Sequence, residues 1–458
     1  MLLIKQFINS CQKYADKTVL IDGDNGTSLT YRDLFAKVES LSKYFASNQT
    51  SANIGILLPN SPEFVITFFA VLLSGKTAIP LNYLLEKSEL EYIIKQAEIT
   101  TVITSDYYKE IKDFNDTAVE LHAIDSTRLS TILYTSGTSG HPKGVMLSDD
   151  NLLSNVTDMK KSMRMECYTI LSILPFFHGF GLTCGLLKPI ISGGTVVLAK
   201  RFNPKQVSEL IEKYNINMLL SVPSVYGAFL RSPESNKSLG NLDLCVSGGE
   251  ALAKDIQNGF NKHFNQSIYE GYGLTETSPV ISLNMPHAHK IGSVGKPLAS
   301  VDVKFADDDE IWVKGPNVMK GYYKQPELTD EVITKDGWFK TGDIGKLDND
   351  GFLFITGRKK DMIISSGENI FPAEIEHVLS EHPEIVECAV IGVTDKRRGE
   401  VPKAFIVCNK DKEVKDHDIK DFCRGKLANF KIPAHIEIRP ELPKGPTGKI
   451  LKKVLKEI

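Results

Sequence analysis

A stretch rich in glycine and hydroxyl residues is the strongest candidate for chemistry in this sequence. It reads TILYTSGTSGHPKGVMLS and spans residues 131–148. Glycines let backbone N–H groups converge on an anion, hydroxyls add hydrogen-bond donors, and Lys143 adds a mobile positive charge. A flexible linker rarely has strand-like runs on both sides and a Pro-Lys-Gly inside. The stretch therefore predicts a phosphate-binding loop made by Thr135, Ser136, Gly137, Thr138, Ser139 and Lys143.

Two other sequence patterns suggest different chemistry, but each matches its motif only in part. A Walker A loop ends in G-K-[ST], and these letters occur at residues 75–77. The position that should hold the first glycine of that motif is Ala70, and the run between is apolar, so we expect an ordinary turn there. His287 and His289 could begin a hydrolytic zinc site, but no third ligand lies nearby in the sequence.

A second segment, YEGYGLTETSP at residues 269–279, combines four residue types that suit a nucleotide. Tyr272 could stack on a base, and Gly273 would let the backbone approach a phosphate. Thr275 could donate to that phosphate, and Glu276 could bind Mg²⁺. Taken alone, the segment could equally be a surface turn capped by its threonine.

Charged residues in three later segments also suit this chemistry. Asp343 in GWFKTGDIG could accept hydrogen bonds from both ribose hydroxyls, although a T-G-D turn often holds a purely structural aspartate. Arg358 follows in GRKKD. Lys449 in PKGPTGKI lies on a glycine-bounded loop that could be inserted and withdrawn, whereas the alternative is one more solvated lysine of a basic tail.

In this order, the segments resemble the signature motifs of the adenylate-forming superfamily, which includes acyl-CoA synthetases, luciferases and peptide-synthetase adenylation domains. The resemblance begins with YTSGTSGHPKG and covers essentially the whole chain. It implies that Tyr272 stacks on adenine, that Thr275 contacts the α-phosphate and that Glu276 holds Mg²⁺. It also implies that Asp343 and Arg358 contact the ribose.

The resemblance extends to three more site segments. SGGEAL at residues 247–252 places Gly249 and Glu250 in the nucleotide site. The family's catalytic lysine matches Lys449, and the glycine that lines the pantetheine tunnel matches Gly367 in ISSGENIFPAEIE. His178 in LPFFHGFGL matches a residue where the acyl pocket meets that tunnel, although a core histidine packed on phenylalanines is a close alternative.

These matches predict an ATP-dependent acid–thiol ligase that uses Mg²⁺ and coenzyme A. The enzyme would form an acyl-adenylate, with a fatty acid as the expected substrate, and pass the acyl group to CoA. Amino-acid-activating relatives carry an aspartate near position 178, and its absence disfavours a zwitterionic substrate. An aryl acid–CoA ligase and an acyl-AMP ligase that loads an acyl carrier protein remain alternatives, and a homodimer stays open.

Hydrophobic periodicity then predicts the elements that position these residues. Residues 18–21, 54–58, 101–104 and 131–134 are strand-like. A helix should follow Thr30 as N-cap, burying Leu34, Val38, Leu41 and Phe45 on one face. A second helix should start at a capping box of Ser88 and Glu91 and carry Leu90, Ile93 and Ile94.

This alternation predicts an α/β protein whose large N-terminal domain, residues 1–359, holds mostly parallel sheets with flanking helices. Residues 302–323 should add an antiparallel β-rich section. Residues 360–458 should form a small, mobile α+β C-terminal domain with its hinge near Lys360, where relatives pivot.

Composition bounds the remaining properties. The chain has 458 residues, a net charge of -3 and 42% hydrophobic residues, typical of a globular protein with no nucleic-acid partner. No apolar run is long enough to span a membrane. The seven cysteines form no C-x-x-C pair. These features predict a cytoplasmic protein.

Overall fold

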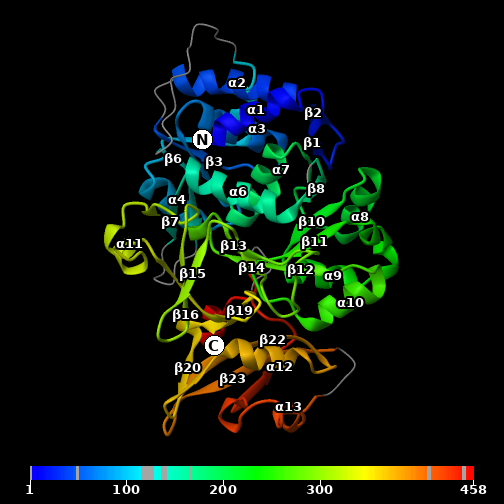
Figure 1. Cartoon of the computed structure of the whole chain (residues 1–458), viewed down its shortest axis with the longest axis vertical. Helices are drawn as coiled ribbons and strands as arrows, with labels where there is room; N and C mark the ends of the chain where they lie inside the picture. Colours follow the sequence, from blue (N-terminus) through cyan, green and yellow to red (C-terminus); the bar gives the residue numbers. More distant parts are fainter. Residues whose placement is uncertain are drawn as a thin grey trace.

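The computed structural model describes residues 3–47, 51–114, 128–135, 142–165, 167–409, 414–445 and 450–457. The described residues form four β-sheets, and strands of both large sheets lie in the upper half of the view in Figure 1. The N-terminal helices lie at one end, and the C-terminal sheet lies at the other. Among the described residues, no helix is both long and apolar enough to cross a membrane.

The largest sheet has nine strands, and its central part is parallel. Its strands in spatial order are β14 (Lys296–Pro297), β13 (Val280–Leu283), β12 (Ile268–Gly273), β11 (Leu244–Ser247), β10 (Met218–Ser221), β8 (Thr169–Ser172), β9 (Thr195–Leu198), β1 (Thr18–Asp22) and β2 (Ser28–Thr30). The second sheet has six strands, parallel except at the end formed by β17 and β7. They are β17 (Gly321–Tyr322), β7 (Lys143–Ser148), β6 (Leu129–Thr135), β4 (Thr77–Pro80), β3 (Asn53–Ile56) and β5 (Thr101–Ile103).

The other two sheets are smaller. An antiparallel sheet contains β15 (Asp302–Phe305), β16 (Glu310–Lys314), β18 (Phe339–Leu347) and β19 (Leu353–Arg358). The C-terminal sheet contains β21 (Glu368–Ile370), β20 (Ile363–Ser365), β23 (Gly399–Cys408), β22 (Ile385–Asp395) and β24 (His435–Ile438). The antiparallel section after residue 302 and the α+β section after Arg358 are therefore as predicted.

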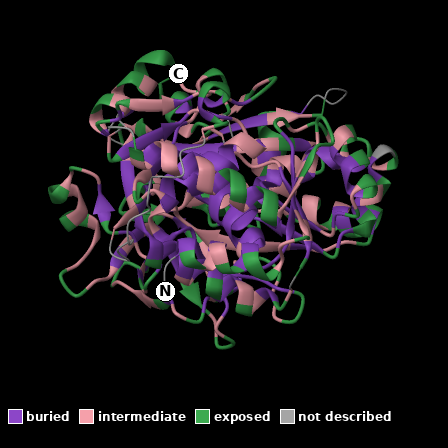
Figure 2. Ribbon diagram, turned by 90° about the horizontal axis from the view of Figure 1, so that it is seen from above, coloured by how far each residue is buried: buried purple, intermediate pink, exposed green. Residues whose placement is uncertain are grey.

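Helices pack around the two large sheets, and buried residues gather in the middle of the molecule (Figure 2). The helices are α1 (Leu3–Lys13), α2 (Tyr31–Ser47), α3 (Pro62–Leu73), α4 (Lys87–Gln96), α5 (Ser105–Ile111), α6 (Asp149–Met163), the π-helix η1 (Phe180–Leu187), α7 (Lys188–Ile191), α8 (Pro204–Lys213), α9 (Pro223–Leu230), α10 (Lys254–Phe264), α11 (Pro326–Val332), α12 (Pro372–Ser380), α13 (Asp416–Cys423) and α14 (Lys452–Lys456). The α/β class predicted from the sequence is confirmed.

Local sequence explains where these helices start. The Thr30 hydroxyl accepts from the Asp33 N–H at 3.1 Å, and the predicted face of α2 is buried. The capping box predicted at Ser88 and Glu91 is wrong, because α4 begins at Lys87. The Glu86 N–H donates instead to the Glu89 carboxylate at 3.4 Å, which lets the helix begin one residue before Ser88.

The G-K-T letters form the turn that the sequence predicts. Helix α3 ends at Leu73, Gly75 adopts a φ of 82°, and strand β4 starts at Thr77. The Lys76 ammonium donates to the Ser51 carbonyl at 3.2 Å rather than facing a loop of backbone N–H groups. A P-loop kinase is therefore excluded at this position.

Candidate active site

A cavity of about 1290 Å³ lies where three of the sheets meet the C-terminal tail. Most of the predicted site residues line it, although they come from sequence positions as far apart as 135 and 358. They are Thr135, Lys143, His178, Gly249, Glu250, Tyr272, Gly273, Thr275, Glu276, Asp343 and Arg358. The fold thus brings together residues that share no local sequence.

At one end of the cavity, Tyr272 and Arg358 both bind Asp343. The Tyr272 hydroxyl donates to Asp343 Oδ2 at 2.7 Å, and Arg358 Nε lies 2.8 Å from Oδ1. Burial, followed by the charge of Asp343, raises the pKa of the Tyr272 phenol well above its ordinary value. The phenol is therefore a neutral donor, and the carboxylate is held in one orientation.

The backbone around Tyr272 is packed too tightly for any residue but glycine at position 273. A Cβ on Gly273 would lie 1.8 Å from the Pro279 carbonyl oxygen, which is a backbone atom with little room to move. This close approach draws the end of β12 against the segment that follows Thr275. Glycine at this position therefore sets the distance between Tyr272 and Thr275.

Glu276, Tyr322 and Lys143 form a second polar group in the cavity. The Tyr322 hydroxyl donates to Glu276 Oε1 at 2.8 Å, and Lys143 Nζ lies 5.3 Å from the centre of the Tyr322 ring. Strand β17 carries Tyr322 and pairs with β7, which begins at Lys143. The pairing of these two strands brings the Lys143 ammonium near the Tyr322 ring, and Glu276, from the short helix Thr275–Thr277, accepts from the hydroxyl of the same side chain.

His178 lines the same cavity and packs against an aromatic neighbour. Its ring centroid is 4.7 Å from that of Phe177, and its Nε2 is buried without a hydrogen-bond partner among the described residues. Burial lowers the pKa of His178 to about 4, so the imidazole is neutral at pH 7. A neutral ring that lines a cavity and has a nitrogen without a hydrogen-bond partner could contact a ligand there. This favours a role in the site over a purely packing role in the core.

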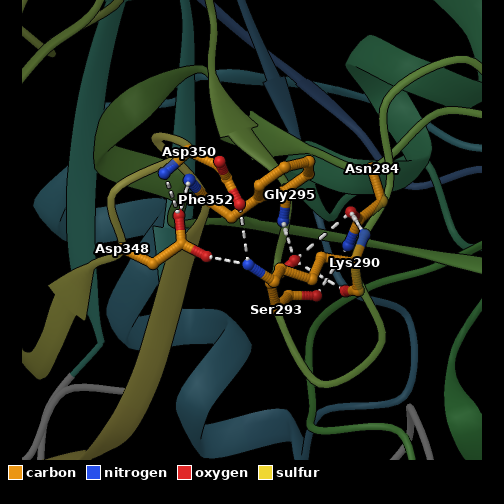
Figure 3. Close-up of polar contacts among 7 residues, drawn as sticks. All are labelled: Asn284, Lys290, Ser293, Gly295, Asp348, Asp350 and Phe352. Carbon is orange, nitrogen blue, oxygen red and sulfur yellow. Dashed lines mark hydrogen bonds and ion pairs between the residues drawn. The ribbon is translucent and has the colours of Figure 1, made fainter.

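A network of polar contacts fixes the strand that carries Asp343 (Figure 3). The Lys290 ammonium lies 2.5 Å from Asp348 Oδ2 and 3.0 Å from Asp350, in the turn between β18 and β19. The Ser293 hydroxyl and Asn284 close the loop around Lys290, with bonds to its carbonyl at 2.7 Å and its N–H at 3.1 Å. These contacts join the nine-stranded sheet to the antiparallel sheet.

The same loop contains the two histidines of the hydrolase alternative. The His289 ring packs against Tyr269, with the ring centroids 5.4 Å apart, and His287 is exposed. Over the described ranges, no group of three or more histidine, cysteine, aspartate or glutamate side chains could hold a metal ion. The zinc hydrolase alternative therefore has no site in this part of the molecule.

Some predicted residues are not brought to the cavity. Gly367 lies with Ser366 in the exposed turn between β20 and β21, with φ angles of 87° and 54°, and does not line the cavity. Ser136, Gly137, Thr138, Ser139 and Lys449 lie outside the described residues. Gly445 and Leu451, on either side of residues 446–449, do line the cavity.

Comparison with known proteins identifies the family. The model of the AMP-binding enzymes matches residues 7–323, and the model of their C-terminal domain matches residues 374–449. The chain belongs to the AMP-binding enzyme family. A long-chain-fatty-acid–CoA ligase of Bacillus subtilis is 34% identical over 98% of this chain and 93% of its own length. A feruloyl-CoA synthase of an Amycolatopsis species is 34% identical over 93% of each chain.

Solved structures of AMP-binding enzymes have the same fold. ATP-bound MatB from Rhodopseudomonas palustris has a TM-score of 0.90 and 29% identity, covering 100% of this chain and 99% of its own. The o-succinylbenzoate CoA synthetase of Bacillus subtilis, in complex with its acyl-adenylate, has a TM-score of 0.86 and 32% identity, with coverage of 98% and 97%. These findings confirm the predicted family and the predicted enzyme class, an AMP-forming acid–thiol ligase.

The cavity also contains polar residues that are not among the site residues predicted from the sequence, Tyr322 and Lys360 among them. Tyr322 binds Glu276 from a two-residue strand, and Lys360 lines the cavity next to Arg358. The sequence indicates Lys360 only as a hinge. The signal for Tyr322 is weak, because a Gly-Tyr-Tyr sequence does not show which strand it pairs with.

Proposed function

We propose that this enzyme activates a carboxylic acid with ATP as an acyl-adenylate and transfers the acyl group to coenzyme A. The observation that carries the proposal is the single cavity that gathers Lys143, Tyr272, Glu276 and Asp343. A carboxylate is a poor acyl donor because its leaving group would be oxide. A mixed anhydride with AMP supplies a better leaving group, and a thiol can then attack the acyl carbon.

In this proposal, the Tyr272–Asp343 end of the cavity binds the nucleoside. The face of Tyr272 would stack on adenine, because its hydroxyl is already held by Asp343 at 2.7 Å. Asp343 would accept from the ribose hydroxyls, and Arg358 would hold that carboxylate in one orientation. Thr275 and Gly273 would then lie at the α-phosphate.

The Glu276 group suits the charged end of ATP. Mg²⁺ prefers oxygen ligands and is commonly held by one or two carboxylates together with phosphate oxygens, so Glu276 fits this ion without a cluster of acidic side chains. When bound, Mg²⁺ would offset the negative charge of the phosphates. Lys143, held over the Tyr322 ring, would add a protein cation on the same side.

We further propose that the chain divides near Lys360 and that residues 360–458 pivot there between the two half-reactions. Support comes from the tail, since Gly445 and Leu451 line the cavity and Lys449 lies between them in the sequence. Lys449 would neutralise charge as pyrophosphate leaves. Gly367 is outside the cavity here, so a role beside the thiol requires the pivot.

The carboxylic acid substrate is proposed to be a fatty acid. A fatty acid would place its chain against the apolar part of the cavity, which Met159, Met163, Leu220 and Val246 line. An aryl acid is the second candidate, because relatives include a feruloyl-CoA synthase and a 4-coumarate–CoA ligase. We propose coenzyme A as the acceptor of the acyl group, with a carrier protein as the alternative acceptor. We also propose a cytoplasmic location.

Acid-dependent exchange of labelled pyrophosphate into ATP tests the first half-reaction. The proposal expects exchange only when a substrate acid is present, and formation of an acyl thioester when CoA is then added. If the acyl group is then transferred to a carrier protein and not to CoA, the carrier protein is the acceptor. No exchange with any fatty or aryl acid would overturn the ligase proposal.

Lys449→Ala separates the two half-reactions. Adenylate formation should fall by about a hundredfold or more, the loss seen when one group that stabilises charge in a transition state is removed. Use of a preformed acyl-adenylate with CoA should stay within a few-fold of wild type. Lys456→Ala, another lysine of the same tail, is the matched control. Equal loss of both half-reactions in Lys449→Ala would contradict the role.

A further inference from the structure

Lys188 is a buried lysine with no partner of opposite charge among the residues that the structure describes. It is the first residue of α7, and only 1% of its surface is exposed. Over the same described ranges, its ammonium nitrogen has no hydrogen-bond partner. The proposed adenylation chemistry gives this side chain no role.

The surroundings of Lys188 are part of the cavity wall. Lys188, Cys184, Met159 and Met163 line the apolar end of the cavity, and the Cys184 and Met159 sulfur atoms are 3.5 Å apart. Lys188 Nζ lies 4.0 Å from the centre of the Tyr168 ring. The face of this ring supplies a weak cation–π attraction to the ammonium, which is less than a carboxylate partner would supply.

An ammonium in this position is costly when the cavity is empty. Burial in apolar surroundings, opposed slightly by the Cys184 thiol, lowers the pKa of Lys188 to about 7, and the positive charge of Lys160 adds to the lowering. An unpaired buried charge is destabilising, whereas a methionine or leucine of similar size would fill the space without that cost. A ligand anion would remove the penalty and would also be attracted by Lys160.

The position of Lys188 relative to the reacting groups defines what such an anion could be. Lys188 comes ten residues after His178, and the π-helix Phe180–Leu187 lies between them. At no more than about 1.5 Å per residue, the two lie up to about 15 Å apart along the helix axis. An acid whose reacting carboxylate is near Thr275 would therefore point its distal end towards Lys188.

We propose that the enzyme is selective for carboxylic acids that carry a second carboxylate at the distal end of the chain, and that Lys188 binds this carboxylate. The inference rests on the proposed ligase function and names its substrate class. The ammonium donates to the distal carboxylate within the closed end of the cavity, where the ion pair is shielded from water. The apolar lining between the two ends holds the methylene chain.

Pyrophosphate exchange with matched pairs of acids tests this selectivity. The pairs are a straight-chain monocarboxylic acid and the α,ω-dicarboxylic acid of the same length, from hexanoic and hexanedioic acid upward. Wild type should use at least one dicarboxylic acid with a kcat/KM about tenfold or more above that of its partner. The methyl half-ester of that dicarboxylic acid should lose this advantage.

Lys188→Met keeps the length of the side chain and removes the charge. The ratio of kcat/KM for the dicarboxylic acid to that for the monocarboxylic acid should fall about a hundredfold, because truncating one partner of a buried charge pair is expensive. Lys205→Met, which removes an exposed lysine of α8, should leave the ratio unchanged. The apparent melting temperature of wild type, but not of Lys188→Met, should rise with the dicarboxylic acid alone.

The outcomes separate this inference from the ligase proposal. If monocarboxylic acids support exchange and dicarboxylic acids are not preferred, the proposed role of Lys188 is wrong. The ligase proposal would still stand. An unchanged ratio in Lys188→Met would lead to the same conclusion. If Lys188→Met fails to fold, the wild-type preference and its loss with the half-ester decide the question. Failure of exchange with every acid would overturn the ligase proposal itself.

Discussion

Asp343 is the residue on which the proposed nucleoside site depends most. Its two oxygens are bound separately by the Tyr272 hydroxyl and by Arg358 Nε, so a neutral amide loses one acceptor oxygen and the charge that pairs with Arg358. We expect Asp343→Asn to raise the KM for ATP by about tenfold to a hundredfold, the range for losing hydrogen bonds to a charged group. The ATP dependence of pyrophosphate exchange measures this change.

The control for this substitution is Asp302→Asn, which alters an exposed aspartate in β15 of the same antiparallel sheet. Its KM for ATP should match that of wild type. If Asp343→Asn leaves the KM unchanged but lowers the melting temperature, Asp343 is a structural residue of a turn, which is the alternative that the T-G-D sequence allows.

His178 gives the free energy of unfolding a specific dependence on pH. Burial lowers its pKa to about 4 in the folded chain from 6.5, so between these values the unfolded state binds more protons. Stability should therefore fall as pH drops from about 6.5 to 4, by up to about 3 kcal/mol from this residue. Chemical denaturation across this range, compared with His178→Gln, isolates the contribution.

The variant should lose less stability than wild type on acidification, because glutamine does not titrate. His435→Gln, which replaces an exposed histidine of β24, should follow the wild-type curve. A constant difference between wild type and His178→Gln from pH 7 to pH 4 would show that the imidazole is not held neutral by burial.

At the scale of elements, the close approach at the end of β12 is the least tolerant feature of the site. A methyl group on Gly273 would lie 1.8 Å from the Pro279 carbonyl oxygen, and relief would require movement of the backbone between Tyr272 and Thr275. We expect Gly273→Ala to destabilise the protein by several kcal/mol or to abolish exchange, because overpacking a rigid site costs at least about 1–3 kcal/mol. Thermal unfolding and exchange assays measure the two effects.

Gly227→Ala provides the matched control, since the added methyl group would make ordinary contact with Ile256 at 3.5 Å inside α9. Helix propensity predicts that this substitution stabilises the protein by up to about 1 kcal/mol. Wild-type stability and activity in Gly273→Ala would show that the backbone at this position adapts freely.

The elements also show what sequence patterns can and cannot predict. Periodicity locates α2 and its buried face because the spacing of apolar residues within one helix is a local property. The pairing of β17 with β7 is not local, so the sequence does not reveal the contact between Tyr322 and Glu276. The predicted start of α4 is wrong because two neighbouring pairs of residues could each supply a capping box.

In the candidate site, too, local sequence motifs are predictable and contacts between distant residues are not. The segments that resemble family motifs identify the residues of the Tyr272–Asp343 end, and the fold brings those residues into one cavity. Lys188 carries no motif, and its meaning depends on burial and on the absence of a partner among the described residues. Sequence alone therefore predicts the shared chemistry of the family better than the features that would select a substrate.

At the scale of the whole molecule, an ion-pair cluster joins the C-terminal sheet region to the body. Glu381, at the end of α12, lies 3.0 Å from Lys254 of α10 and 3.1 Å from Lys426. In this arrangement Gly445 and Leu451 line the cavity, so the contact would favour the position that we propose for the first half-reaction. Such partly exposed pairs contribute no more than about 1 kcal/mol.

Glu381→Gln should therefore shift the balance between two arrangements rather than unfold the protein. A bias of about 1 kcal/mol corresponds to a change of about fivefold in population. We expect slower adenylate formation and equal or faster thiol transfer, measured separately in single-turnover experiments, with wild type approaching the variant as salt screens the pair. Glu374→Gln removes a comparable pair with Lys431 at 2.7 Å within the C-terminal region and should leave both rates unchanged. Equal slowing of both half-reactions in Glu381→Gln would mean that the cluster supports the fold and does not select the position of the C-terminal region.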